Sequence, residues 1–261
     1  MMEFLKVFDA YSLRARLFPA IIASAPALAA MTLLISWKSF ELSNAIATIA
    51  ILVLLFAIAD LARARGRAIE PRLNEKLGGK RSIVMFRRND PTLDDGIKER
   101  YRNFLAVKLG VTAPTAIEEQ ANQAAADSFY EQCGVWLREN TRDTKKFHLL
   151  FTENVTYGFR RNLLGVRWLA IVLNLVVVAI CLGLLWWTHL NWSAPLSQRT
   201  IVVLLIAAVH GFYVIAVVRE SAATDASRAY ARELILSCES FLKEKKATKP
   251  TPPKKKASKT E

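Results

Sequence analysis

The sequence has little of what most reaction centres require. Only three of its 261 residues are cysteine and three are histidine. Cys133, Cys181 and Cys238 are odd in number and lie far apart, so they predict neither a disulfide framework nor a Cys/His metal site. No G-x-S-x-G or H-E-x-x-H motif is present, and "LGGKRS" lacks the first glycine and the spacing of a phosphate-binding loop. We therefore expect no bound metal, no cofactor and no enzymatic activity.

Two weaker candidates for chemistry have simpler explanations. Asp90, Asp94 and Asp95 could hold a divalent ion, but a helix N-terminus attracts acidic residues through its dipole, and this second explanation is favoured. His148 has no acid or thiol near it in the sequence that would make it a general acid or base. An integral membrane enzyme is therefore the least supported class of function.

Long apolar runs, by contrast, are plentiful. The chain is 52% hydrophobic and 23% charged, and the two characters are segregated along it. Each run is close to the roughly 20 residues that cross a bilayer as a helix. The runs lie at about Leu17–Trp37, Asn44–Leu61, Trp168–Trp187 and Thr200–Val218. The sequence predicts an all-α integral membrane protein with four transmembrane helices in two hairpins, residues 17–61 and 167–218.

The first apolar run has a second interpretation. Arg14 and Arg16, followed by an apolar stretch and "ALAAM", resemble a secretory signal peptide with an A-x-A cleavage site. The run continues past that site through "TLLISW", which a cleaved signal does not need. An uncleaved first helix is therefore favoured, preceded by a short N-terminal segment, residues 1–16.

Basic residues predict the orientation. The chain carries a formal net charge of +13, with Lys and Arg concentrated between the two hairpins and in the C-terminal tail. The short loops inside the hairpins hold almost no charge beyond Lys38, Glu41 and Arg199. Because Lys and Arg accumulate on the cytoplasmic side, we expect both termini and the middle segment in the cytoplasm, and the bacterial inner membrane as the location. The basic balance indicates anionic lipid headgroups as a partner, with no specific nucleic acid.

The middle segment, residues 62–166, is long enough for a small, mainly helical cytoplasmic domain. The second span is expected to continue as a helix, interrupted or bent near Pro71 and ended by Gly78-Gly79. Thr92 and Thr115 resemble N-caps and predict helices near 93–109 and 115–140. A third helix is expected from about Asp143, and "RSIVMF" is the one strand-like run. The expected buried face of the 115–140 helix consists of Ala121, Ala125, Phe129, Cys133, Trp136 and Asn140.

The stretch "FTENVTYGFRRNLLGVRW", residues 151–168, combines polar, aromatic and glycine residues just before the third apolar run. Lipid anchoring explains the arginines and the aromatic rings, which suit the level of the phosphates. It does not explain the asparagines, which could bond a neighbouring helix, or the two glycines seven residues apart, which would permit close helix approach. We interpret the stretch as a packed joint between the cytoplasmic domain and the third span. Its residues are Asn154, Tyr157, Gly158, Arg160, Arg161, Asn162 and Gly165.

Two polar residues lie inside the second predicted hairpin. Asn174 and His210 fall at depths of roughly 9 and 12 Å from the cytoplasmic ends of their helices, so they could meet in an antiparallel pair. A structural hydrogen bond is the favoured interpretation. A pore-lining or proton-sensitive pair is the sharper alternative.

After the fourth span, residues 219–244 are expected to form an amphipathic helix. Its apolar stripe consists of Ala223, Ala226, Tyr230, Leu234, Cys238 and Phe241 or Leu242. This helix could pack on the cytoplasmic domain or on its copy in another subunit. Residues 245–261 lack apolar side chains and predict a disordered basic tail.

These features support two functions more than an enzyme. The first is a signal-responsive membrane effector or channel-like homo-oligomer, in which a cytoplasmic ligand or protein acts through the helical domain on the spans. The second is a non-catalytic scaffold that recruits a cytoplasmic partner. The layout resembles that of membrane effectors of bacterial anti-phage systems, an analogy that no shared motif accompanies.

Overall fold

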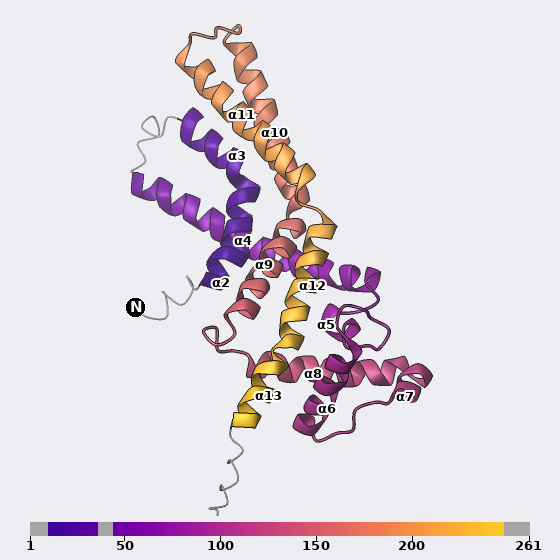
Figure 1. Cartoon of the computed structure of the whole chain (residues 1–261). Helices are drawn as coiled ribbons and strands as arrows, with labels where there is room; N and C mark the ends of the chain where they lie inside the picture. Colours follow the sequence, from indigo (N-terminus) through magenta and orange to yellow (C-terminus); the bar gives the residue numbers. More distant parts are fainter. Residues whose placement is uncertain (1–9, 36–43, 248–261) are drawn as a thin grey trace, which may run out of the picture. The chain divides into compact units, whose positions relative to one another are not determined.

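The computed structural model describes residues 10–35 and 44–247, and in these ranges every regular element is helical (Figure 1). The strand-like run "RSIVMF" is a correction to the sequence prediction, because Arg81–Val84 forms the short helix α5. The chain divides into two compact units. Unit 1 comprises Met1–Lys80 and Phe151–Tyr230, and unit 2 comprises Arg81–Leu150 and Ala231–Glu261.

Unit 1 contains three apolar helices that pack pairwise, α3, α10 and α11 (Figure 1). Val177, Cys181 and Val203 form one part of their shared core. The elements of unit 1 are α2 (Ala10–Ser12), the π-helical turn η1 (Leu13–Leu17), α3 (Phe18–Leu34), α4 (Asn44–Lys76), α9 (His148–Gly165), α10 (Arg167–Trp187), α11 (Pro195–Ala216) and most of α12 (Glu220–Leu236).

Three helices of the described chain are long and apolar enough to cross a membrane. They are Leu13–Leu34, Arg167–Trp187 and Pro195–Ala216. The last two form a clear hairpin, closed at its turn by a 3.0 Å hydrogen bond between the hydroxyls of Thr188 and Ser197. The membrane character predicted from the sequence is thus supported by three candidate spans.

The predicted first hairpin is not clearly present. The run 44–61 forms the first half of α4, but α4 packs against α3 through Ala62 and Ala23 and runs obliquely to it in Figure 1. α4 is one continuous helix of 33 residues, Asn44–Lys76, which joins the apolar run to a polar half. The helix is not interrupted at Pro71, and the chain leaves it, as predicted, at Gly78 and Gly79, which have φ values of 74° and 134°.

Side chains in unit 1 are distributed in the reverse of a soluble protein. Its fully buried positions are mainly small, such as Ala15, Ala20 and Ala170. Large apolar side chains point outward, and Phe212 and Trp186 are 74% and 82% exposed. Small residues at helix contacts and large apolar residues outside are the pattern of helices packed in lipid.

Unit 2 is a helical domain with an ordinary apolar core. Its fully buried large side chains include Phe86, Tyr101, Leu105, Tyr130 and Leu137. Its elements are α5, α6 (Asp95–Leu109), α7 (Ala116–Ala121), α8 (Gln123–Asn140), the end of α12 and α13 (Cys238–Ala247).

The helix boundaries of unit 2 agree with the sequence in part. Thr115 caps α7 with a complete capping box, as predicted. Asp94, and not Thr92, caps α6, because its carboxylate accepts the Ile97 amide. Asn122 then ends α7 and caps α8, which divides the expected helix 115–140 into two.

Of the two faces predicted from periodicity, that of the 115–140 helix is shifted, whereas that of residues 219–244 is largely confirmed, because Ala223, Ala226, Leu234 and Cys238 are buried. On α8, Phe129 and Cys133 are buried as expected, but the stripe continues through Ala126, Tyr130 and Leu137. The expected helix 219–244 is two helices that meet at Ser237, whose hydroxyl donates to the Leu234 carbonyl at 2.6 Å.

The second of these helices, α13, packs within unit 2. The ring of Phe241 lies 5.3 Å from that of Trp136 and 5.5 Å from that of Phe147. Unit 2 begins at Arg81, whereas the domain predicted from the sequence begins at residue 62. Unit 2 also includes C-terminal residues that the predicted domain, residues 62–166, does not include.

Candidate functional site at a helix crossing

The seven residues of the predicted joint all lie on α9, and part of α9 crosses α4 and η1 within unit 1. The crossing with α4 is close enough to bring the two backbones into contact. A Cβ atom at Gly165 would lie 2.4 Å from the Gly66 amide nitrogen, and one at Gly66 would lie 2.9 Å from the Asn162 Cα. A side chain at either glycine would have to displace backbone, so glycine is required at both.

The second glycine of the joint faces a different element. A Cβ atom at Gly158 would lie 3.0 Å from the Ala15 Cβ and 3.2 Å from the Tyr11 hydroxyl oxygen. This approach is less tight than that of Gly165, and the neighbouring atoms are side chains. The two glycines therefore set two separate contacts of α9, with η1 and with α4.

Polar side chains fasten the same crossing. The Glu70 carboxylate on α4 accepts hydrogen bonds from the Tyr157 hydroxyl at 2.9 Å and from the Arg161 guanidinium at 2.8 Å. Burial, followed by the negative charge of Glu70, raises the pKa of Tyr157, so its hydroxyl stays protonated and donates. The Asn162 amide donates to the Ala15 carbonyl of η1 at 2.7 Å and is almost fully buried.

η1 connects this polar crossing to an apolar helix. It is π-helical and runs directly into α3, the first candidate span. π-Helical turns are rare and frequent at functional sites. The hydrogen bond from Asn162 to Ala15 therefore ties polar helix α9 to the beginning of an apolar span.

The remaining joint residues make no such connection. The Arg160 guanidinium lies over the ring of its neighbour Phe159 at 5.7 Å. Asn154 is half-buried. At the far end of α4, Glu220 of α12 binds Lys76 at 2.5 Å, and this bond lowers the pKa of the Glu220 carboxyl.

The two predicted intramembrane residues lie on the facing helices α10 and α11. The Asn174 amide donates to the Ala207 carbonyl at 3.0 Å, one turn before His210, and its own oxygen lacks a hydrogen-bond partner in the described chain. His210 is 7% exposed and lies beside the backbone of Ile22, yet neither imidazole nitrogen makes a regular hydrogen bond with a described residue. The two side chains share a helix pair, but no hydrogen bond joins them.

The arrangement at the crossing can position helices. Among the described residues, no three His, Cys, Asp or Glu side chains are grouped to hold a metal ion. Burial raises the pKa of the Cys133 thiol to about 12, so this thiol is not a nucleophile at neutral pH. The chemistry of the crossing is hydrogen bonding and close backbone packing.

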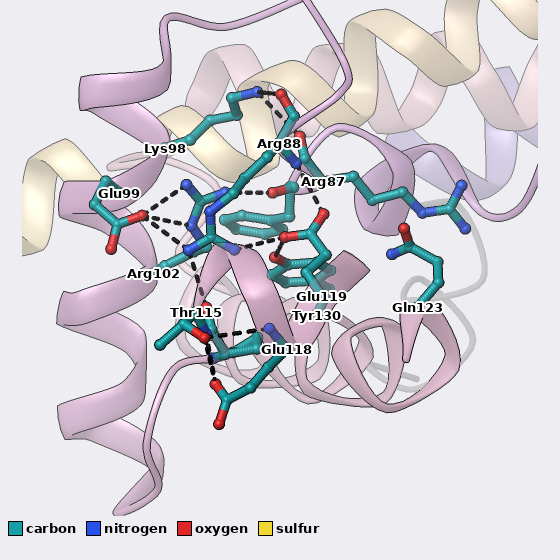
Figure 2. Close-up of polar contacts among 12 residues, drawn as sticks. Arg87, Arg88, Lys98, Glu99, Arg102, Thr115, Glu118, Glu119, Gln123 and Tyr130 are labelled. Carbon is teal, nitrogen blue, oxygen red and sulfur yellow. Dashed lines mark hydrogen bonds and ion pairs between the residues drawn. The ribbon is translucent and has the colours of Figure 1, made fainter. Parts of the chain in front are cut away.

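A second polar centre, in unit 2, was not predicted from the sequence (Figure 2). Lys98 is fully buried, and its ammonium donates to the carbonyls of Arg87, Arg88 and Asp90 at 3.0, 3.3 and 2.7 Å. The ammonium also pairs with the Asp95 carboxylate at 2.8 Å. The positive charge of Lys98 thus holds three carbonyls of the loop after α5 together.

Glu119 completes this centre from α7. Its carboxylate accepts the Arg88 amide at 2.9 Å, the Arg88 guanidinium at 2.6 Å and the Tyr130 hydroxyl at 2.6 Å. Burial alone would raise the pKa of Glu119, but these hydrogen bonds outweigh it and lower the pKa. The fully buried Arg102 adds a 2.7 Å bond to the Phe86 carbonyl and a 2.8 Å pair with Glu99.

One sequence signal could have indicated this centre. Lys98 and Arg102 are four residues apart and share a face of α6 with Tyr101 and Leu105, which are apolar enough to be buried. Two basic residues on an apolar helix face predict buried cations that need acceptors. The partners of the joint, Gly66 and Glu70, could not be found this way, because they lie about ninety residues earlier in the chain.

Comparison with known proteins gives no further guide. No family model matches the chain, and neither a curated protein nor a solved structure is similar to it. Function is therefore inferred from the residues and geometry of this chain.

Proposed function

We propose that this protein is a membrane-embedded, signal-responsive effector in which unit 2 acts as a cytoplasmic domain that controls the membrane helices. The observation that carries the proposal is the crossing of α9 with α4 and η1. Through Asn162 and Ala15, a polar helix is bonded to the turn that begins a candidate span. A movement of α9 would therefore be transmitted directly to the beginning of that span.

The connection from unit 2 follows the chain itself. Two helices, α9 and α12, each begin in one unit and end in the other, with boundaries after Leu150 and Tyr230. A continuous helix transmits a shift along its axis better than a loop does, because its backbone hydrogen bonds resist stretching. Binding of a ligand or partner to unit 2 would act on the crossing by this route.

The first half of α4 is proposed as the fourth span, giving two hairpins. Leu52, Val53 and Leu54 are consecutive and all about half exposed or more, at 49%, 62% and 52%. Consecutive helical residues point about 100° apart, so apolar surface surrounds this half of α4. The 18 residues of the run, about 27 Å long as a helix, suit the hydrocarbon core of a bilayer.

A pore would require several copies of the chain. The interior between α3, α10 and α11 is filled by side chains, including Val177, Cys181 and Val203. An ion path would therefore have to form between subunits, which is the reason to propose a homo-oligomer. The distribution of Lys and Arg along the sequence favours both termini and unit 2 in the cytoplasm, at a bacterial inner membrane with anionic headgroups, and this is the orientation proposed here.

Topology reporters test the fourth span, because two points of the chain separated by an even number of spans lie on the same side of the membrane. Reporters are fused at the N-terminus, at Asn122 in α7–α8 and at Ser193 in the α10–α11 turn. With α4 crossing the membrane, the N-terminus and Asn122 lie on the same, inner side and Ser193 lies outside. A reporter at Asn122 on the opposite side from the N-terminus would show that α4 does not cross.

Effector action is tested by membrane potential. Expression of the full chain in bacteria, with a voltage-sensitive dye, should depolarise the cells or slow their growth once the trigger is present. Gly165→Leu should abolish this effect without preventing membrane insertion, because it separates the backbones of α9 and α4. Gly183→Leu is the matched control, since a Cβ atom there meets nothing within 4 Å.

A non-catalytic scaffold is the alternative, and one feature of unit 2 favours it. An open groove of about 420 Å³ lies along α7 and α8, lined by residues such as Pro114, Asn122 and Phe129. A scaffold would hold a partner peptide there and leave the membrane potential unchanged at every expression level. An unchanged potential, with loss of a partner on removal of residues 81–150, would support the scaffold over the effector.

A further inference from the structure

A partly enclosed pocket lies between η1 and the middle of α4. Its volume is about 130 Å³, and its walls include Arg16 and Leu17 from η1 together with Phe56, Asp60 and Arg63 from α4. The pocket belongs to unit 1 and lies outside the α9 crossing, so the proposed function does not use it. Its lining combines two cations and one anion with apolar side chains.

Both walls of the pocket are located at the end of an apolar helix. The candidate span Leu13–Leu34 begins beside it. On α4, the last large exposed apolar side chain is Leu61, and Arg63 follows two residues later. In a bilayer this is the level of the lipid phosphates, where arginine is favoured. The position therefore indicates a lipid headgroup and not a soluble ligand.

The charged side chains of the pocket form no ion pair with any other side chain in the described part of the chain. Asp60 is exposed, and within the described residues neither Asp60 nor Arg63 forms an ion pair with another side chain. The Arg16 guanidinium is held over the Tyr11 ring at 5.7 Å, which leaves its N–H groups free to bind an anion. An uncompensated carboxylate at the membrane boundary is costly, so a cation beside Asp60 would be stabilising.

We propose that this pocket binds the headgroup of an ethanolamine phospholipid. The phosphate lies between Arg16 and Arg63, where each guanidinium donates charge-assisted hydrogen bonds to its oxygens. The ammonium of the headgroup donates to Asp60, and an acyl chain follows Leu17 and Phe56. The headgroup and the pocket are complementary because the phosphate meets two arginines and the ammonium meets a carboxylate. This inference rests on the membrane embedding proposed above.

The test uses native mass spectrometry of the full chain in detergent. Phospholipids with identical acyl chains and ethanolamine, glycerol or choline headgroups are added separately, and the bound lipid is counted. The ethanolamine lipid should be retained best, because choline has no N–H donor for Asp60 and glycerol carries no cation. Inorganic phosphate should not displace it, since phosphate lacks the acyl contacts.

Three variants assign the binding to the pocket. Asp60→Asn should reduce retention of the ethanolamine lipid to that of the choline lipid. Arg63→Gln should weaken all three lipids by roughly tenfold, the effect of losing one charged hydrogen bond. Arg65→Gln, which removes the same charge from α4 outside the pocket, should change nothing. Circular dichroism checks that each variant remains helical.

Several outcomes would overturn the proposal. Equal retention of the three lipids would show no headgroup recognition, and displacement by inorganic phosphate would show a site for phosphate alone. Stronger glycerol-lipid binding that rises further in Asp60→Asn would show a site for anionic lipid only. If the topology reporters show insertion while lipid selectivity is absent, only this inference fails. If the chain does not insert, the proposed function fails independently of the adducts measured in detergent.

Discussion

The two units handle buried polar groups in opposite ways. In unit 2, Lys98, Arg102 and Glu119 are buried charges, and each is held by several hydrogen bonds or ion pairs. In the apolar bundle of unit 1, buried His210 and the oxygen of Asn174 lack regular hydrogen-bond partners among the described residues. Unit 1 concentrates its polar bonds at the α9 crossing, below the spans.

The difference is the one expected for a proposed arrangement in which lipid surrounds the apolar helices of unit 1 and water surrounds unit 2. A soluble domain has water as its reference state, so a buried charge is stable only when several acceptors replace that water. For a membrane helix the reference state is lipid, in which the packing of small residues stabilises helix contacts and polar groups are few. Unit 2 therefore uses charge networks to fix its loops, and unit 1 uses glycine and alanine contacts.

The difference between the two units is tested by substitutions, and the largest effect is expected at Arg102. Arg102→Ala should destabilise unit 2 by about 3 kcal/mol, because the Phe86 carbonyl loses its donor and a buried space is left. Hydrogen exchange of α6 amides in the full chain should report the loss. Arg100→Ala is the control, since its pair with Glu239 is exposed and contributes less than about 1 kcal/mol. Equal effects of the two variants would contradict the role of the buried network.

The next effect is expected at Glu70, the polar centre of unit 1. Glu70→Ala removes the acceptor of Tyr157 and Arg161 and should loosen the α9 crossing by about 2 kcal/mol, since both hydrogen bonds end on one partly exposed carboxylate. Thermal unfolding of the full chain in detergent measures this loss of stability. Glu75→Ala, on the same helix and exposed, should have no measurable effect. A crossing that tolerates Glu70→Ala would be held by its glycine contacts alone.

A smaller effect is expected inside the bundle. Asn174→Leu should cost about 0.6 kcal/mol, the usual contribution of a hydrogen bond between membrane helices. In a double-mutant cycle with His210→Leu, the two changes should be additive, because Asn174 donates to the Ala207 carbonyl. Coupling larger than the Asn174→Leu effect itself would show that the two side chains meet in the membrane.

The smallest effect concerns pH and unit 2. The folded-state pKa of Glu119 is lowered from its ordinary value of 4.5, so its contribution to stability is present above that value and is lost as the pH falls toward the lowered pKa. Burial partly offsets the hydrogen bonds, which keeps the effect small. Hydrogen exchange of α7 and α8 should be constant above pH 5, after correction for intrinsic rates, and rise below pH 4.5. Glu119→Gln should remove this pH dependence.

The sequence by itself determined the helical class and the apolar segments. Length and apolarity are properties of a continuous stretch, so three candidate spans, the Thr115 cap and the end of α4 at Gly78-Gly79 could be predicted from local residues. Residues 151–168 could also be recognised, because lipid anchoring explains the arginines and aromatic rings of this stretch but not its asparagines and glycines. Gly158, Asn162 and Gly165 do lie at a close helix crossing.

Only the tertiary structure decided which residues meet. Gly66 and Glu70 of α4 and Ala15 of η1 became the partners of α9, although they are separated from it by about ninety residues or more. The same holds for the carbonyl oxygens around Lys98 and for the Ala207 carbonyl that binds Asn174. The physical reason is that a backbone carbonyl looks the same at every position of a sequence, so its role is set only when folding brings a donor within hydrogen-bonding distance.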